Sequence, residues 1–350
     1  MKHTIFFFLA LVMIIGVVGA CDDDDDDDDA TDDDVVDDDT IDDDTTDDDV
    51  IDDDVVDDDT IDDDTADDDT SDDDTTDDDD TVDSEEIKAM SFNLRTGLAG
   101  DGENSWWFRR GIVTDFINEE APDVMGVQEA LIFQINFITE NVPGYAYVGR
   151  SRRIIPDEYC AVFYRTDRFE LIEQDTFWLS DTPEVVGSVF TYNQLCPRIV
   201  TWVALESLLT GRTLYVFNTH FDTYHGDEVH ERSAALLVEK IEELAGDNPV
   251  IVTGDFNETI DSNGYRILTG DHTYNGFSGE MIDPWITLGL PDEGTFHGFT
   301  GEPTGDSRID WVLYTDPITP LDAAVSHYNQ NDRYPSDHFP VYAEFEWPAE

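Results

Sequence analysis

Polar side chains able to bind a cation or move a proton follow the ends of several apolar segments of this sequence. Asn93 follows Ile87–Phe92, and Gln128 and Glu129 follow Val124–Val127. Others in similar positions are Asn218, His220, Asp255 and Asn257. One polar residue after a strand is usually a turn or a cap, but several in one domain indicate a site, because α/β proteins assemble sites at strand ends. Carboxylate and amide oxygens suit a hard divalent cation, and imidazoles suit proton transfer.

The elements that must position these side chains alternate between β-rich and helical segments, as in an α/β domain. Asn104 or Ser105 can cap a helix that runs to about Glu119, and Gly246 ends an amphipathic helix over Glu231–Ala245. The predicted strands are Ile87–Asn93, Val124–Gln128, Tyr159–Tyr164, Ile199–Leu205, Thr213–Asn218, Val250–Gly254, Ile309–Tyr314 and Phe339–Phe345.

Six short motifs make a more specific pattern. They are, in order, Ser91-Phe92-Asn93, Gln128-Glu129, Asn218-Thr219-His220, Gly254-Asp255-Phe256-Asn257, Arg308-Ile309-Asp310 and Ser336-Asp337-His338. The set resembles the endonuclease/exonuclease/phosphatase (DNase I-like) family over residues 87–346. Stretches such as Gly102–Trp106, Thr176–Pro183 and Gly294–Phe299 are similar to a bacterial branch near the deadenylase-like members. The motifs are specific for the family and carry little information about the substrate.

The resemblance implies a four-layer α/β sandwich with two mixed β-sheets and an enzyme that uses Mg²⁺ or Mn²⁺. It places Glu129 as the principal metal ligand, with Asn93 and Asp337 beside it. A cation there would neutralise phosphoryl oxygens and assist the leaving oxygen. Glu129 could instead hold a strand end, although beside a second carboxylate it would be repelled if no cation were bound.

The resemblance also assigns the catalytic residues. It implies that His338 is the base or the acid that stabilises the phosphate, and that Asp310 orients it. Asp255 and Asn257 correspond to the pair that orients the attacking water and the phosphate. The structural alternatives are a plain His–Asp hydrogen bond for the first pair and an Asp-x-Asn turn for the second.

Further residues are expected near the phosphate. His220 resembles the family's second histidine, a phosphate donor, and Glu158 occupies the position of its partner. Arg198 matches a family arginine and would contact phosphate, with a surface salt bridge as the alternative. Asn218 is also expected on the phosphate.

One loop and three aromatic residues leave alternatives open. Relatives in this branch often carry a Gly-Arg-Asp-Asp-Gly-like turn, whereas residues 149–156 here contain arginines in place of the acids. That loop could be a basic spot facing the substrate or a solvated loop. Tyr147, Trp178 and Phe296 could stack on a base or sugar, but core packing is the favoured interpretation.

Acidic residues dominate the chain, whose formal net charge is −68. Residues 22–83 contain 40 Asp and no Lys or Arg, largely as three Asp followed by two small or β-branched residues. Such a segment cannot offset its ordering entropy, so we expect a disordered stalk; a low-affinity cation sponge is the alternative. Residues 84–350 keep a net charge of −29, which repels polyanions and disfavours a role in coating nucleic acid.

The first 21 residues resemble an export signal that ends in a lipobox. Ile5–Val18 is apolar but short for a membrane span, and small residues precede Cys21. We expect lipidation of Cys21 and an exported protein anchored by lipid to the bacterial cell envelope; a signal anchor with an incidental cysteine is the alternative. Cys160 and Cys196 could form a disulfide, or Cys160 could be a buried free thiol.

These features predict a lipoprotein signal peptide over residues 1–21, the stalk over 22–83 and a catalytic domain over 84–350. The predicted function is metal-dependent phosphoester hydrolysis at the cell envelope by a monomer, as a nuclease or phosphodiesterase acting on nucleic acid or a nucleotide. A phosphatase or phosphodiesterase of a small phosphoester or lipid head group is a second possibility. A non-enzymatic surface or cation-binding lipoprotein is a third.

Overall fold

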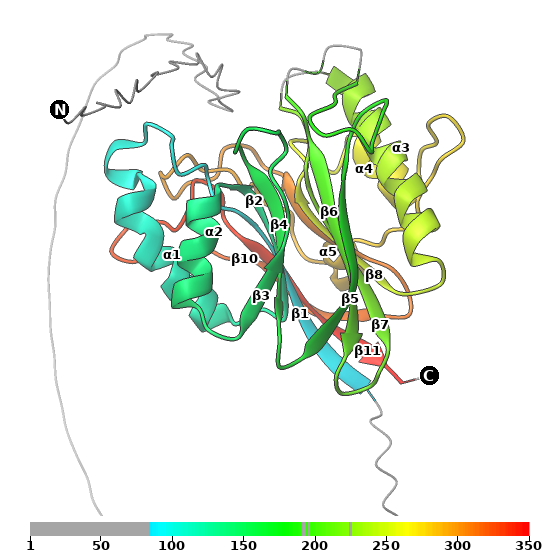
Figure 1. Ribbon diagram of the computed structural model, residues 1–350, viewed down its shortest axis with the longest axis horizontal. Coiled ribbons are helices and arrows are strands. Elements are labelled where there is room, and N and C mark those ends of the chain that lie inside the picture. Colours follow the sequence, from blue (N-terminus) through cyan, green and yellow to red (C-terminus); the bar gives the residue numbers. More distant parts are fainter. Residues whose placement is uncertain (1–83, 191–193, 195, 224–225, 350) are drawn as a thin grey trace, which may run out of the picture. The chain divides into compact units, whose positions relative to one another are not determined.

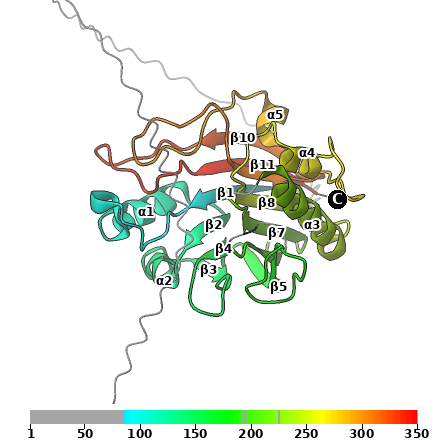
Figure 2. The ribbon, with the colours of Figure 1, turned by 90° about the horizontal axis from the view of Figure 1, so that it is seen from above.

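The computed structural model describes residues 84–190, 194, 196–223 and 226–349. The expected lipidation site at Cys21 and the expected stalk over 22–83 lie outside the described residues. Two mixed β-sheets pack face to face, and helices cover their outer faces (Figures 1 and 2). This is the four-layer α/β sandwich that the sequence predicts, and the prediction is confirmed.

The first sheet has six strands in the order β10-β11-β1-β2-β4-β3. They are β10 (Thr319–Val325), β11 (Val341–Pro348), β1 (Ser84–Asn93), β2 (Val124–Ala130), β4 (Tyr159–Arg165) and β3 (Tyr145–Val148). β1 and β2 are parallel, and the other neighbours are antiparallel. The carboxyl ends of β1 and β2 therefore meet at one edge, which is the upper end in Figure 1.

The second sheet has five strands in the order β5-β6-β7-β8-β9. They are β5 (Phe169–Trp178), β6 (Ile199–Ser207), β7 (Thr213–His220), β8 (Val250–Asp255) and β9 (Asp310–Tyr314). Only β7 and β8 run parallel, with His220 beside Asp255. Each sheet thus contributes one parallel pair whose carboxyl ends carry polar residues.

The helices form the outer layers. They are α1 (Trp106–Glu120), α2 (Ile132–Asn141), α3 (Gly226–Ala245), α4 (Asn263–Thr269), the short α5 (Pro284–Leu288) and the 3₁₀ turn η1 (Gly102–Asn104). Figure 2 shows α1 and α2 over the first sheet and α3 and α4 over the second. Among the described residues, no helix is both long enough and apolar enough to span a bilayer.

Three apolar cores hold the four layers together. One lies between the sheets and includes Val124, Val216 and Ile251. Another packs α3 and α4 on the second sheet, and the third packs α1 and α2 on the first. Within the described part of the chain, the side chains of all three cores lie between residues 87 and 347.

A polar seam also joins the two sheets. Asn218 of β7 donates from Nδ2 to the carbonyl oxygens of Val127 and Ala161, at 2.9 and 3.0 Å. Its Oδ1 accepts from Gln128 at 2.7 Å and from Thr253 at 3.1 Å. Every hydrogen-bonding group of this buried amide is therefore used between β-strands, as a buried polar group requires.

Candidate active site

Five polar side chains meet where the two parallel strand pairs end. Asn93 ends β1 and Glu129 lies one residue before the end of β2. His220 ends β7, and Asp255 ends β8 opposite Asp310, the first residue of β9. The structure thus brings together from both sheets side chains that are far apart in sequence.

The first cluster consists of Glu129, His220 and Asp255, whose potential ligand atoms lie within 4.8 Å of one another. Asn93 bridges it, because its Nδ2 donates to Glu129 Oε1 at 2.9 Å and to Asp255 Oδ2 at 2.8 Å. Thr96 N donates to the other Glu129 oxygen at 2.8 Å. The two carboxylates are therefore held side by side by neutral donors.

The second cluster consists of Asp255, Asp310 and His338, again within 4.8 Å. His338 Nδ1 lies 2.8 Å from Asp310 Oδ2, and its Nε2 lies 3.8 Å from Asp255 Oδ2. Thr295 Oγ1 donates to Asp310 Oδ2 at 2.6 Å. Asp310 is therefore fixed from one side and orients the imidazole from the other.

Burial and neighbouring charges shift both titrating partners. Burial, and next the carboxylate of Asp310, raise the pKa of Asp255 to about 7, against the opposing effects of His338 and Asn93. Burial disfavours charge on His338, but Asp310 and Asp255 outweigh it and raise the pKa of His338 well above its ordinary value. These two carboxylates therefore favour the charged form of the His338 imidazole.

The donor set fits a hard divalent cation. Three buried carboxylates, those of Glu129, Asp255 and Asp310, lie in two overlapping clusters. Among the described residues, Oδ1 of Asp310 is a buried oxygen that has no hydrogen-bond partner. Buried carboxylates at this spacing repel one another unless a cation or a proton intervenes, and oxygen ligands are those that Mg²⁺ and Mn²⁺ prefer.

Two of these residues occupy unusual backbone conformations. Glu129 has φ 57° and Asn257 has φ 51°, in the left-handed region that residues other than glycine seldom adopt. Such strain is kept where surrounding contacts over-determine it, which is common at functional sites. Here Asn257 N donates to Asp255 Oδ1 at 3.0 Å.

His220 makes a different contact from the expected one. Asn257 Nδ2 donates to His220 Nε2 at 3.0 Å and to the carbonyl of Phe221 at 3.2 Å. The carbonyl can only accept, which fixes the orientation of the amide, so His220 Nε2 accepts as well. In this arrangement Nε2 of His220 aligns Asn257, and the ring hydrogen lies on Nδ1.

A small pocket of about 10 Å³ adjoins the first cluster, and Glu129, Glu158, Arg198 and His220 line it. Arg198 is 2% exposed and donates from Nη2 to Thr223 Oγ1 at 3.0 Å. Its Nε lies 3.9 Å from Asp222 Oδ1, so Arg198 takes part in an ion pair, but that pair is buried and is not the surface salt bridge of the alternative. The pocket itself has room for little more than a water molecule.

The arginines of the loop over residues 149–156 contact acidic and aromatic side chains, so the loop is not solvated throughout. Arg152 is 4% exposed, and its Nη1 lies 2.6 Å from Glu158 Oε2. Arg153 pairs with Asp157 at 3.1 Å, while Arg150 lies over the ring of Trp178. Arginines in this loop therefore neutralise acids beside the site.

Asn218 and Asp337 have partners outside the two clusters. Asn218 was expected on the phosphate, but the inter-sheet seam uses both of its amide hydrogens. Asp337 belongs to neither cluster; its Oδ2 lies 3.4 Å from Arg95 Nε, and Ser336 Oγ donates to its Oδ1 at 3.1 Å. Asp337 therefore holds Arg95 in this structure.

Arg95 and Thr295 are neighbours of the site that the sequence motifs do not indicate. Arg95 follows Asn93 by two residues, pairs with Asp101 at 3.2 Å and reaches Asp337. Thr295 lies within a stretch quoted for the family resemblance, yet nothing in that stretch indicates a bond to Asp310. Proximity to a motif was the only sequence signal for either residue.

The expected aromatic residues divide into two groups. Trp178 is buried and donates to the carbonyl of Arg152, and Tyr147 packs against Phe163. Phe296 is half-buried, and its ring lies 5.1 Å from that of His338. Core packing therefore holds for the first two, whereas Phe296 borders the site.

Cys160 is a buried free thiol, so no disulfide joins it to Cys196. Burial raises the pKa of Cys160 to about 12. The thiol is therefore protonated at neutral pH and behaves as a small apolar group.

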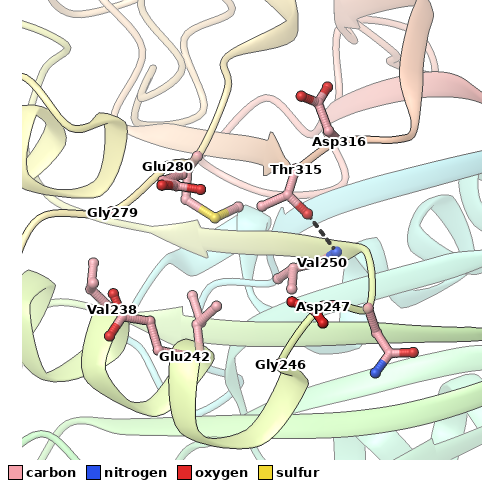
Figure 3. Close-up of a pocket in the computed structure, with 12 residues that line it drawn as sticks. Val238, Glu242, Gly246, Asp247, Val250, Gly279, Glu280, Thr315 and Asp316 are labelled. Carbon is pink, nitrogen blue, oxygen red and sulfur yellow. Dashed lines mark hydrogen bonds between the residues drawn. The ribbon is translucent and has the colours of Figure 1, made fainter.

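A second pocket, of about 440 Å³, lies away from these clusters (Figure 3). It adjoins Val250, the first residue of β8, whereas Asp255 is the last. Its lining includes the acidic residues Glu242, Asp247, Glu280 and Asp316, and its described lining contains no Lys, Arg or His. It therefore offers no positive charge to a phosphate.

Known proteins match nearly all of the described residues. The model of the endonuclease/exonuclease/phosphatase family matches residues 90–338. An endonuclease/exonuclease/phosphatase from Bacteroides vulgatus is 31% identical, with a TM-score of 0.68, and the match covers 75% of this chain and 99% of that one. The mannosyl-6-phosphatase of Bacteroides thetaiotaomicron is 30% identical, with a TM-score of 0.66, and 74% and 99% are covered.

Curated relatives are more distant. The Ccr4 3'-5'-exoribonuclease subunit of the CCR4-Not complex from Mycosarcoma maydis is 21% identical over 315 residues, which cover 69% of this chain and 46% of that protein. The chain spans less than half of the length of this relative and of the next ones.

Proposed function

The chain belongs to the endonuclease/exonuclease/phosphatase family, and from that premise we propose that it hydrolyses a phosphoester in a reaction that depends on Mg²⁺ or Mn²⁺. The observation that carries the proposal is the convergence of Glu129, Asp255 and Asp310 with His338. Non-enzymatic cation binding would not need the buried His338–Asp310 pair, which is why an enzyme is favoured.

We assign Glu129 to the cation, because Asn93 and Thr96 N hold its carboxylate in place beside Asp255. Asn93 would bind the cation through Oδ1, which accepts from Arg95 N at 2.9 Å. When bound, the cation would supply charge for the phosphoryl and leaving oxygens. Asp337 is assigned a supporting role through Arg95.

The remaining residues would bind the phosphate and position water. Asp255, whose pKa is raised to about 7, accepts the proton of the attacking water, and Asn257 orients that water with the help of His220. His338, kept cationic by Asp310, donates from Nε2 to a phosphoryl oxygen. Arg198 contributes positive charge from the pocket beside Glu129, and Glu158 balances Arg152 there.

Two substrate classes fit this site. Relatives named as exoribonucleases support nucleic acid or a nucleotide, but the net charge of −29 over residues 84–350 opposes long polyanions. The more similar protein named as a mannosyl-6-phosphatase supports a small phosphoester. We therefore propose a short or small phosphoester, of which a lipid head group is one kind.

The place of action is proposed from the sequence alone. A lipobox at Cys21 and an acidic stalk over 22–83 would hold the domain at the cell envelope as a lipid-anchored monomer. Replacement by Cys21→Ser in the native host should move the protein from the membrane fraction to the soluble fraction. Unchanged membrane association would favour a signal anchor.

The function is tested with purified chain of residues 22–350 and bis-p-nitrophenyl phosphate. We expect turnover that EDTA abolishes and that Mg²⁺ or Mn²⁺ restores. A Glu129→Gln variant should lose activity by about 10²-fold or more, since it removes the principal ligand charge. Turnover unaffected by EDTA would refute metal dependence, and no turnover on a panel of DNA, RNA, nucleotides, sugar phosphates and phospholipids would refute the enzyme.

A further inference from the structure

Arg109 is a buried arginine that none of the site motifs includes. It lies in the first turn of α1 and is 1% exposed. Its guanidinium donates from Nε to the carbonyl of Asn104 at 3.0 Å and from Nη1 to that of Pro335 at 2.7 Å. Its Nη2 donates to the carbonyl of Arg95 at 2.8 Å. All three nitrogens therefore bind backbone oxygens, and two of the acceptors, Arg95 and Pro335, lie far apart in the sequence.

The carbonyl of Arg95 belongs to the peptide unit that orients Glu129. The nitrogen of the same peptide unit is Thr96 N, which donates to Glu129 Oε2 at 2.8 Å. Because a peptide unit is planar, holding its oxygen also fixes the direction in which its N–H points. The bond from Arg109 therefore helps to aim the donor that holds the carboxylate.

Gln134 of α2 binds the same carbonyl from another side. Its Nε2 donates to the Arg95 oxygen at 3.0 Å, and its own Oε1 accepts from Gly97 N and Leu131 N. A carbonyl oxygen has two lone pairs, and Arg109 and Gln134 together use both. The turn after β1 is thus held by one side chain from each of the helices α1 and α2.

The carbonyl of Pro335 begins the segment that leads to His338. The hydrogen-bonded pairing of β1 with β11 ends before this segment and before that of Arg95, so the ladder does not hold the two segments together. One guanidinium spans them, because Arg109 binds a carbonyl of each. Arg109 therefore joins the part of the site that contains Glu129 to the part that contains His338.

The charge of Arg109 is retained although the side chain is buried. Burial lowers its pKa to about 10, while the carboxylates of Asp337, Asp101 and Glu129 act in the opposite direction. The guanidinium is therefore charged at neutral pH. Its rigid planar fork can bind several acceptors at fixed angles, which the single ammonium group of a lysine cannot do.

We propose that Arg109 is a positioning residue that holds the two segments of the active site at a fixed separation through their backbone carbonyls. It acts through Thr96 N on Glu129 and through the backbone at Pro335 on His338. This inference rests on the proposed function, because it adds a positioning residue to the same site.

The main test is Arg109→Lys in residues 22–350, which keeps the charge but replaces three nitrogens by one. Mn²⁺ binding is measured without substrate, from the electron paramagnetic resonance signal of free Mn²⁺. The dissociation constant should rise by about 10- to 100-fold, as when a partner that orients a metal ligand is lost. At saturating Mn²⁺, kcat on bis-p-nitrophenyl phosphate should also fall by about tenfold or more, because the segment of His338 is released.

Arg168→Lys is the matched control. Arg168 also donates to three acceptors, namely Asp123 Oδ1 at 2.8 Å, Glu85 Oε1 at 3.0 Å and the carbonyl of Glu86 at 2.7 Å. These acceptors lie at the beginning of β1 and just before β2, at the opposite ends of these strands from the site. The control should lower Tm and leave the Mn²⁺ dissociation constant and kcat within about twofold.

Wild-type Mn²⁺ binding and kcat in Arg109→Lys, with Tm lowered as in Arg168→Lys, would overturn the proposal and leave Arg109 a purely structural residue. Equal weakening of Mn²⁺ binding in both variants would overturn it as well.

A second variant decides the question if Arg109→Lys does not fold. Gln134→Met releases the Arg95 carbonyl on one side and leaves the bond from Arg109 to Pro335 in place. It should weaken Mn²⁺ binding by about tenfold and leave kcat at saturating Mn²⁺ within about threefold. In that case, wild-type Mn²⁺ binding by Gln134→Met would overturn the proposal.

Two further outcomes separate the inference from the proposed function. Turnover of bis-p-nitrophenyl phosphate with equal Mn²⁺ binding and kcat in wild type and Arg109→Lys would reject the positioning role and leave the hydrolase. Mn²⁺ binding that Arg109→Lys weakens, with no turnover of any phosphoester by the wild type, would reject the hydrolase and keep the positioning role.

Discussion

Asp255 belongs to both clusters of the site. One oxygen accepts from Asn93 and faces both His220 Nε2, at 3.6 Å, and His338 Nε2, at 3.8 Å. Burial and the carboxylate of Asp310 raise its pKa to about 7. A carboxylate in that position is stabilised by a proton or by a cation, so a cation that bound there would displace the proton.

Asp310→Asn tests the second cluster. The amide cannot supply the charge that keeps His338 protonated, so the pKa of His338 should fall. We expect kcat to drop by about 10²- to 10⁴-fold, the usual contribution of acid–base catalysis, and the alkaline limb of the pH–rate profile to move to lower pH. Glu170→Gln on the exposed face of β5 is the control. An unchanged profile in Asp310→Asn would remove His338 from the reaction.

Most site residues could be predicted because their motifs stand at strand ends. Asn218 also ends a predicted strand and Asp337 precedes one, yet the side chain of Asn218 contacts the opposite sheet and that of Asp337 contacts Arg95. Which of several polar residues at a strand end faces the cleft depends on how the two sheets pack. That packing has no local signature in the sequence.

At the scale of elements, the core strands were predicted better than the edges. β2 and β8 are fully buried and have apolar sequences. β5 is mostly exposed over Glu170–Asp175, and α2 is rich in isoleucine and phenylalanine, which do not favour a helix. Ser105 is the N-cap of α1, but its side chain makes no capping bond. Tertiary packing, and not local sequence preference, determines the secondary structure of these segments.

Gly126→Ala tests how closely the sheets approach. A Cβ atom at Gly126 would lie 2.0 Å from Thr253 Oγ1 and 2.4 Å from Asn218 Oδ1. The substitution should lower the free energy of unfolding by about 1–3 kcal/mol, the usual effect of overpacking, as measured by urea denaturation. Gly111→Ala on α1, where a Cβ meets nothing within 4 Å, should instead be neutral or stabilising by up to about 1 kcal/mol. An equal change in the free energy of unfolding for Gly126→Ala and Gly111→Ala would mean that the two sheets are not tightly packed at Gly126.

The pair of His230 on α3 and Glu258 after β8 should make stability depend on pH. Nδ1 of His230 lies 2.9 Å from Glu258 Oε1, and although burial opposes it, Glu258 raises the pKa of His230 above 6.5. The charged pair thus stabilises the fold fully below pH 6.5 and loses that contribution as pH rises through the folded-state pKa.

Glu258→Gln should remove this dependence. The stability difference between wild type and variant should be about 1–3 kcal/mol at pH 6, as for a hydrogen bond to a buried charge, and should shrink by pH 9. Thermal unfolding at both values measures it. A stability difference between wild type and Glu258→Gln that grows with pH would contradict the pH dependence assigned to the His230–Glu258 pair.

At the scale of the whole molecule, the acidic residues are concentrated in one segment of the sequence. Residues 22–83 carry 40 Asp, whereas the core side chains of the described part of the chain lie between residues 87 and 347. Deleting residues 22–83 should therefore leave kcat and KM on a soluble phosphoester within about twofold and leave Tm unchanged, because the described core has its own contacts. A large loss of turnover would show that the acidic segment takes part in the reaction.

The most direct test of the central claim is the position of the cation. Anomalous scattering at the manganese edge, from crystals of residues 22–350 grown with Mn²⁺, should give a peak in contact with the Glu129 carboxylate beside Asp255, and the same measurement on Glu129→Ala should show the peak weakened or gone. A manganese peak elsewhere with this cleft empty, or one that persists unchanged without Glu129, would contradict the account.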